Sequence, residues 1–248
     1  MTTLHWEGCV NVRDLGGLPR ANGGTTARGS IIRSDNVGDL TEAGWRSLAG
    51  HGVVRIVDLR WPVEREGERP PPVEVEVVHV PLLGDALDEA YLTELNASLD
   101  ASDDVADHYA WSYVDFLERF RDRFGLALGA VAEVDGTVVV HCAGGKDRTG
   151  LVSALLLRLV GVDRTVIAAD YAVSEANLAP NGPAWIQAVD DEVERDRRRK
   201  LMLTPARAML HTLDELERRY GAVDRYVRAA GLADAQIERL RSRLADGP

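Results

Sequence analysis

The segment 137–150 constrains the fold of this 248-residue chain more than any other, because it joins a buried strand to a helix through a glycine-rich turn. Three of the five residues 137–141 are consecutive valines, which is typical of a strand buried on both faces of a sheet. Gly144 and Gly145 follow, and a helical pattern begins at Asp147. Ligands of open α/β sheets bind at such carboxyl strand ends, against the positive end of a helix dipole. The segment therefore predicts an α/β fold with an anion site at this turn.

Strand and helix patterns alternate along the chain until this turn, and helical patterns follow one another after it. The strand patterns cover residues 30–33, 53–60, 75–81 and 137–141. The helical patterns cover residues 42–50, 107–124, 147–160, 163–171, 183–202, 205–219, 223–230 and 233–244, with N-cap candidates at Thr41, Asp163, Thr204 and Asp234. We expect one α/β domain over residues 1–248, with a central, mostly parallel sheet flanked by helices and a helical C-terminal portion.

The helical pattern at 107–124 carries an aromatic and aliphatic stripe that includes all three phenylalanines of the chain. The stripe consists of Tyr109, Tyr113, Phe116, Leu117, Phe120 and Phe124. Their spacing of three and four residues places them on one face of a helix. We interpret this face as part of the core rather than as a cofactor site.

The turn also carries the two side chains with the most chemistry, Cys142 and Arg148. Gly144 and Gly145 lack a Cβ, so successive backbone N–H groups can converge on an anion. The Arg148 guanidinium can bind two phosphate oxygens at once. A cysteine at the mouth of such a site is surrounded by positive potential, which favours the reactive thiolate.

Cys142 and Arg148 are separated by five residues, which is the Cys-x5-Arg signature of the protein tyrosine phosphatase superfamily. The fuller string His-Cys-x-x-Gly-Lys-Asp-Arg-Thr-Gly resembles the atypical bacterial tyrosine phosphatases that also act on phosphoserine, phosphothreonine or phosphoinositides. Other matching elements are Asn11-Val-Arg13-Asp14-Leu-Gly16-Gly17, Arg33-Ser34-Asp35, Asp58-Leu-Arg60 with Glu64, Asp170-Tyr171 and Tyr220-Gly-Ala-Val. The resemblance spans nearly the whole chain and implies one catalytic domain. A nucleotide-binding P-loop is excluded, because no Ser or Thr follows the lysine of the turn.

The resemblance implies a role for each residue of the turn. Cys142 attacks phosphorus and forms a cysteinyl-phosphate. Backbone N–H groups and the Arg148 side chain hold the phosphate oxygens, and Thr149 hydrogen-bonds the thiolate. The phosphate-binding residues are Ala143, Gly144, Gly145, Lys146, Asp147, Arg148 and Thr149. We expect His141, Asp58, Arg60, Arg13 and Asp14 to support the turn, and we expect neither a metal nor a cofactor.

The general acid remains open between two carboxylates. The run Trp61-Pro62-Val63 lacks the aspartate of the Trp-Pro-Asp loop that classical members carry. Asp85 follows the third strand pattern and aligns with an aspartate of the resembled group, whereas Asp147 lies within the turn itself. We favour Asp85 as the acid and keep Asp147 as the alternative.

Lys146 stands out because the chain has only two lysines among its 29 basic residues. A compact ammonium on a flexible stem suits a second phosphate better than a guanidinium does. In the resembled group this lysine is associated with phosphoinositide activity. We therefore expect Lys146 to favour phosphoinositide substrates, with simple inheritance of the motif as the alternative.

Composition limits the partners of the chain. Its formal net charge of −11 argues against nucleic acid as a partner, because phosphate backbones need a basic face. No run of eighteen apolar residues and no signal-peptide pattern is visible, so we expect no stable membrane insertion and a cytoplasmic location. We expect a cysteine-dependent phosphatase acting on phosphotyrosine, with phosphorylated proteins or phosphoinositides as partners. The alternatives are a primarily phosphoinositide-directed phosphatase and an inactive phosphate-binding module.

Overall fold

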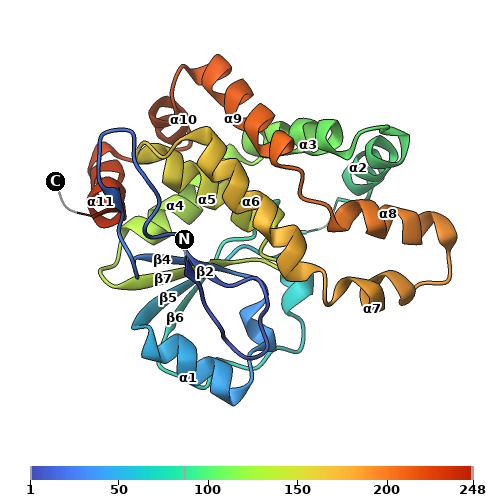
Figure 1. Ribbon diagram of the computed structural model, residues 1–248, viewed down its shortest axis with the longest axis horizontal. Coiled ribbons are helices and arrows are strands. Elements are labelled where there is room, and N and C mark those ends of the chain that lie inside the picture. The colour runs from blue at the N-terminus through green and yellow to red at the C-terminus, as the bar shows by residue number, and fades with distance from the viewer. Residues whose placement is uncertain (1, 87, 247–248) are drawn as a thin grey trace.

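Four adjacent parallel strands make up most of a six-stranded sheet in the computed structural model, which describes residues 2–86 and 88–246 (Figure 1). The strand order is β1-β2-β4-β7-β5-β6. The parallel strands are β4 (Ile31–Ser34), β7 (Thr137–His141), β5 (Val53–Asp58) and β6 (Glu76–His79). Two short strands, β2 (Arg13–Asp14) and β1 (Thr2–Thr3), continue the sheet in antiparallel orientation at the β4 edge.

The valine-rich strand β7 lies in the middle of the sheet, between β4 and β5. All five of its residues are buried. Val139 pairs in register with Ile32 on one side and with Ile56 on the other. Both faces of β7 are covered by other elements, which explains why apolar residues occupy consecutive positions.

Helices cover the two faces of the sheet (Figure 1). Helix α1 (Glu42–Gly50), capped by the Thr41 hydroxyl, covers one face, where Leu48 packs with Ile56 and Val139. Helices α4 (Arg121–Ala132) and α5 (Asp147–Leu159) contact the strands on the other face. The remaining helices are α2 (Glu89–Ala101), α3 (Val105–Arg119), α6 (Arg164–Leu178), α7 (Gly182–Gln187), α8 (Glu192–Met202), α9 (Ala206–Tyr220), α10 (Val223–Ala229) and α11 (Asp234–Leu244).

This architecture confirms the predicted α/β class, the mostly parallel sheet and the helical C-terminal portion. A separate two-stranded ribbon of β3 (Thr25–Thr26) and β8 (Ala245–Asp246) joins the N-terminal part of the chain to its last described residues. Two short 3₁₀ helices, η1 (Val37–Asp39) and η2 (Pro62–Arg65), follow β4 and β5.

Several predicted element bounds were wrong. The pattern at 107–124 is divided between α3 and α4, because the chain turns at Phe120, whose φ of −113° and ψ of 27° leave the helical region. The pattern at 183–202 is divided into α7 and α8, and the Asp191 side chain caps the second helix. Thr204 is not an N-cap, because α9 begins after Pro205 and the Thr204 hydroxyl donates to the Ala172 carbonyl instead.

Among the helices that the structure describes, none combines the length and apolar character that crossing a membrane requires.

Candidate active site

The loop 142–146 connects the buried strand β7 to the first turn of α5. It therefore lies at the carboxyl end of the central strands, the edge where open α/β sheets bind ligands. Within this loop, Gly145 adopts a φ of +63°, and a Cβ there would lie 2.5 Å from the Ser34 carbonyl carbon. Only glycine fits this position, because it tolerates positive φ and adds no side chain against β4.

Three successive carbonyl groups of the loop are held away from its interior by hydrogen bonds. The Asn36 N–H donates to the Ala143 carbonyl at 2.9 Å. The Asn11 side-chain amide donates to the Gly144 carbonyl at 2.9 Å, and the Arg33 guanidinium donates to the Gly145 carbonyl at 2.6 Å. Within residues 2–86 and 88–246, the N–H groups of residues 143–148 donate to no other group. A concave row of unused donors of this kind binds anions.

A buried ionic cluster fixes the loop from behind. Asp170 accepts hydrogen bonds from Arg13, at 2.8 Å, and from Arg33, and all three side chains are buried. Burial by itself would raise the pKa of Asp170, but Arg33 and Arg13 hold that pKa below its usual range. Two arginines against one carboxylate leave excess positive charge behind the loop, which favours an anion in front of it.

Cys142 is 2% exposed and lies at the end of a pocket of about 360 Å³. The loop 142–146 and the start of α5 contribute one side of this pocket, and the end of α6 with α7 and α8 contributes the other. The lining residues are Cys142, Ala143, Gly144, Lys146, Asp147, Arg148, Leu178, Asn181, Gly182, Trp185, Leu201 and Met202. Sequence reasoning did not predict the second half of this set, because the end of α6 and the two following helices lie far along the chain from Cys142.

Arg148 lines the same pocket and forms a two-pronged ion pair with Glu64 of η2, at 2.5 and 2.8 Å. The Trp61 ring lies under the guanidinium, 4.7 Å from ring centre to the guanidinium carbon. Burial opposes ionisation of Glu64, but hydrogen bonding to Arg148 lowers the pKa of Glu64. Glu64 and Trp61 therefore fix the orientation of the arginine.

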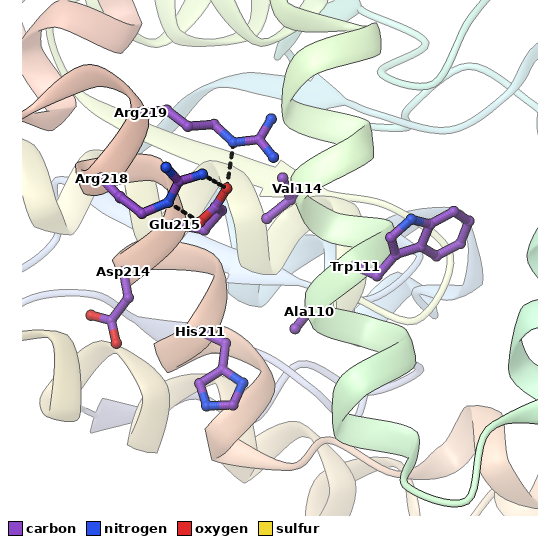
Figure 2. Close-up of a pocket in the computed structure, with 8 residues that line it drawn as sticks. All are labelled: Ala110, Trp111, Val114, His211, Asp214, Glu215, Arg218 and Arg219. Carbon is purple, nitrogen blue, oxygen red and sulfur yellow. Dashed lines mark hydrogen bonds and ion pairs between the residues drawn. The ribbon is translucent and has the colours of Figure 1, made fainter.

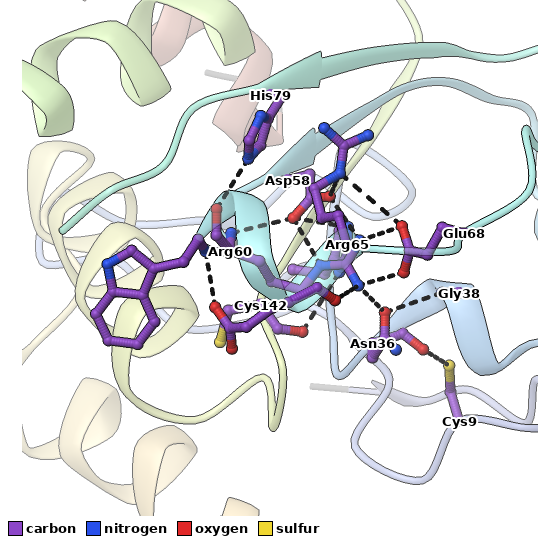
Figure 3. Close-up of polar contacts among 12 residues, drawn as sticks. Cys9, Asn36, Gly38, Asp58, Arg60, Arg65, Glu68, His79 and Cys142 are labelled. Carbon is purple, nitrogen blue, oxygen red and sulfur yellow. Dashed lines mark hydrogen bonds and ion pairs between the residues drawn. The ribbon is translucent and has the colours of Figure 1, made fainter. Parts of the chain in front are cut away.

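Three of the side chains expected to support the loop, those of Asp58, Arg60 and His141, belong to a second buried network, and Figure 3 shows Asp58 and Arg60 within it. Asp58 accepts from Arg60 at 2.7 Å and lies 3.5 Å from His141. Burial lowers the pKa of His141 to about 4, despite the opposing effect of Asp58, so this imidazole is neutral at pH 7. Arg60 also donates to the Asn36 side chain at 2.7 Å, and Asn36 holds the Ala143 carbonyl. The network thus connects β5 to the loop.

Asp14 lies apart from this network. Its carboxylate accepts from the N–H groups of Gly16 and Gly29, both at 2.8 Å, and stabilises the N-terminal turn. Its neighbour Arg13 acts on the loop through Asn11. Arg13 donates to the Asn11 side-chain oxygen at 2.6 Å, and the Asn11 amide donates to the Gly144 carbonyl.

The two acid candidates lie in different surroundings. Asp85 is on the surface, pairs with Arg123 through both carboxylate oxygens and is not among the described residues that line the Cys142 pocket. Hydrogen bonding to Arg123 lowers the pKa of Asp85. Asp147 lines the pocket, and its Oδ1 accepts a hydrogen bond from the Tyr113 hydroxyl.

The Lys146 ammonium is buried and bound to protein oxygens. It donates to the Tyr109 hydroxyl at 2.8 Å and to the carbonyls of Leu201 and Leu203 at 2.5 and 3.3 Å. Burial alone would lower the pKa of Lys146, but Asp147 and Tyr109 raise it above its usual range. Lys146 therefore connects the loop 142–146 to the C-terminal end of α8.

Another hollow, of about 460 Å³, lies between α3 and α9 (Figure 2). Its charged groups neutralise one another, because Glu215 accepts hydrogen bonds from both Arg218 and Arg219. It contains no cysteine and no loop of free N–H groups among the residues that line it. The Cys142 pocket is therefore the better candidate for chemistry.

Comparisons with known proteins agree with this geometry. A family model described as the tyrosine phosphatase family matches residues 4–246. A protein of Cupriavidus necator with a provisional tyrosine-protein phosphatase name is 30% identical over 98% of this chain and 89% of its own length. The triple specificity protein phosphatase PtpB of Mycobacterium tuberculosis is 30% identical over 97% of this chain and 98% of its own. A tyrosine-protein phosphatase of Nostoc commune is 27% identical over 87% of this chain and 74% of its own.

Proposed function

Because this chain belongs to the tyrosine phosphatase family, we propose that it hydrolyses phosphotyrosine through a covalent cysteinyl-phosphate at Cys142. One observation carries the proposal: Cys142 and Arg148 line the same pocket, beside a loop whose carbonyl groups are bound elsewhere. The free N–H groups and the guanidinium can hold the three non-bridging phosphate oxygens.

The proposed reaction has two steps at this loop. In the first, the Cys142 sulfur bonds to phosphorus while the bond from phosphorus to the substrate oxygen breaks, and that oxygen takes a proton from a carboxyl group. In the second, water bonds to phosphorus, its proton passes to the same carboxylate, and the sulfur leaves as a thiolate. The Thr149 hydroxyl is buried and has no hydrogen-bond partner within the described residues, which supports its proposed role as a donor to that thiolate.

Arg148 can bind phosphate while it remains paired with Glu64. Arginine has five N–H donors, of which Glu64 occupies two. The remaining donors can reach phosphate oxygens, and Glu64 limits the rotation that would otherwise cost entropy on binding.

Two observations support Asp147 as the proton donor and acceptor, in place of the Asp85 favoured by the sequence. Asp147 lines the pocket of the nucleophile, whereas Asp85 is engaged by Arg123 outside it. A general acid must come within hydrogen-bond reach of the leaving oxygen, so position in the pocket decides between them.

The pocket walls support an aromatic phosphomonoester as the substrate. Leu178, Trp185 and Met202 supply apolar surface beside the loop, which suits the ring of phosphotyrosine. The phosphoinositide alternative depends on a cation for a second phosphate, and the Lys146 ammonium is bound to three protein oxygens. The basic residues of α8 are also paired with acidic residues, for example Arg198 with Glu194.

Turnover of para-nitrophenyl phosphate by the purified chain tests the proposal. Cys142→Ser should reduce kcat by several orders of magnitude, because the nucleophile is lost while the loop persists. Cys9→Ser is the matched control, since Cys9 is not among the described residues that line the Cys142 pocket, and serine can donate to the Asn36 carbonyl as Cys9 does. Activity should persist in EDTA. An inactive wild-type chain would instead indicate a phosphate-binding module.

A further inference from the structure

Three buried tyrosine hydroxyls lie beside the loop 142–146 and the start of α5. Two of them come from the face of the 107–124 pattern that the sequence assigns to the core. Tyr109 and Tyr113 come from α3 and Tyr171 from α6, and each is at most 3% exposed. Their rings pack together, with centroids 5.4 Å apart for Tyr109 and Tyr113 and 5.9 Å apart for Tyr113 and Tyr171. Burying a hydroxyl is unfavourable unless it is hydrogen-bonded, so the partners of these groups matter.

The hydroxyls of Tyr171 and Tyr113 form a directed chain that ends on Asp147. Each tyrosine has one proton to donate. The Tyr113 proton is used toward Asp147 Oδ1, so in the 2.7 Å bond between the two hydroxyls Tyr171 is the donor. Both hydroxyls have a pKa raised by burial, so they remain neutral donors at any physiological pH.

Tyr109 has a different partner. Its hydroxyl accepts from Lys146 and donates toward the Leu201 carbonyl at 3.3 Å, and within the described residues it forms no hydrogen bond with Asp147. The cluster therefore has two parts: Tyr109 binds the Lys146 ammonium, whereas Tyr113 and Tyr171 are hydrogen-bonded to the Asp147 carboxylate in series. The titratable and charged groups around Asp147 are Lys146, at 3.4 Å, Tyr113, Tyr171, Tyr109, His108 and Arg148.

We infer that Tyr113, oriented by Tyr171, is a positioning residue that holds the Asp147 carboxylate in the Cys142 pocket for proton transfer. The inference rests on the proposed role of Asp147. Tyr113 binds Oδ1, whereas no hydrogen bond within residues 2–86 and 88–246 uses Oδ2, which leaves that oxygen for the leaving group or for water. A fixed carboxylate transfers its proton faster than one that rotates freely at a half-exposed position.

Tyr113→Phe removes only the hydroxyl and tests this inference. The leaving tyrosine oxygen of phosphotyrosine needs a proton, whereas para-nitrophenolate leaves without one. We expect kcat on a phosphotyrosine peptide to fall by about tenfold, the effect of one hydrogen bond to a charged group, with kcat on para-nitrophenyl phosphate nearly unchanged. KM should change little on either substrate.

The ratio of the two kcat losses supplies a readout that a purely structural role would not change, because a structural defect lowers kcat on both substrates alike. Tyr171→Phe should produce a smaller difference between the two substrates in the same direction.

Tyr226→Phe is the matched control, because Tyr226 is another buried tyrosine whose hydroxyl donates at 2.9 Å, but to the Leu117 carbonyl in the core. It should lower thermal stability like Tyr113→Phe and leave the substrate ratio as in the wild type. Equal losses on both substrates in Tyr113→Phe would overturn the inference. Asp147→Asn separates the two proposals: if it lacks the leaving-group dependence, the acid assignment and the inference both fail. If Asp147→Asn shows it and Tyr113→Phe does not, only the inference fails.

Discussion

At the scale of single residues, the backbone of Gly145 sets the shape of the loop 142–146, on which the proposed phosphate binding depends. Its positive φ turns the carbonyl toward Arg33, which leaves the neighbouring N–H groups unused. Gly144 has no positive φ, and a Cβ there would meet Leu178 at 3.6 Å and the Lys146 Cβ at 4.0 Å, both ordinary van der Waals distances. The two adjacent glycines therefore differ in what they tolerate.

Gly145→Ala should lower the free energy of unfolding by at least about 2 kcal/mol, through the left-handed backbone and the clash with Ser34. Phosphate binding should be lost as the loop shifts. Gly144→Ala is the control for stability and should change the unfolding free energy by well under that amount. Chemical denaturation of both variants measures the difference, and equal losses would contradict the account.

The residue scale also shows what local sequence can predict. Cys142 and Arg148 belong to one short strand–turn–helix segment, so their shared pocket follows from it. Asp170 and Arg33 are far apart in the chain, and only a match to a known family brings them together. Asp85 illustrates the opposite case: its place after a strand is consistent with an acid, but the sequence does not show that Arg123 pairs with it.

At the scale of elements, hydrogen bonds from Lys146 attach the C-terminal end of α8 to the loop 142–146. The backbone carbonyls of a helix C-terminus carry partial negative charge and attract a cation. Leu201 and Met202, at this helix end, form part of the pocket wall. The lysine therefore shapes the wall as well as the potential of the site.

Lys146→Ala should consequently lower kcat/KM on a phosphotyrosine peptide and on a phosphoinositide by similar factors, roughly tenfold, because the wall is loosened for both. Lys200→Ala is the matched control: Lys200 also contacts carbonyl groups, those of Leu99 and Asp100, but not the loop. A clearly greater loss on the phosphoinositide would show that Lys146 serves a second phosphate, as the sequence suggests.

Two of the four predicted N-caps are correct, whereas Asp234 is already the first residue of α11, whose N-cap is Ala233. Thr41 and Asp163 cap α1 and α6 as expected. The apolar spacing continues through Phe120, so periodicity alone cannot show the turn between α3 and α4. Helix α2 was not predicted, although Asp88 caps it, because only Tyr91 and Leu99 are buried along it and its apolar pattern is weak.

At the scale of the whole molecule, an acidic chain concentrates positive charge at one internal place. The formal net charge is −11, yet four basic side chains lie in or beside the loop 142–146. They are Arg13, Arg33, Lys146 and Arg148. Screening limits exposed surface charges to a range of about 8 Å at physiological salt, whereas buried charges act more strongly at short range. This local concentration of positive charge supports the proposal that an anionic substrate binds at the loop despite the negative charge of the whole molecule.

The central claim is that a phosphoryl group passes through the Cys142 sulfur. The most direct measurement is an acid quench during turnover of para-nitrophenyl phosphate, followed by proteolysis and mass spectrometry of the cysteine-containing peptides. We predict one phosphoryl group on the peptide that contains Cys142, none on the peptide that contains Cys9, and none in Cys142→Ser. Turnover in which the phosphoryl group is found on another residue, or on no residue at any quench time, would contradict the account.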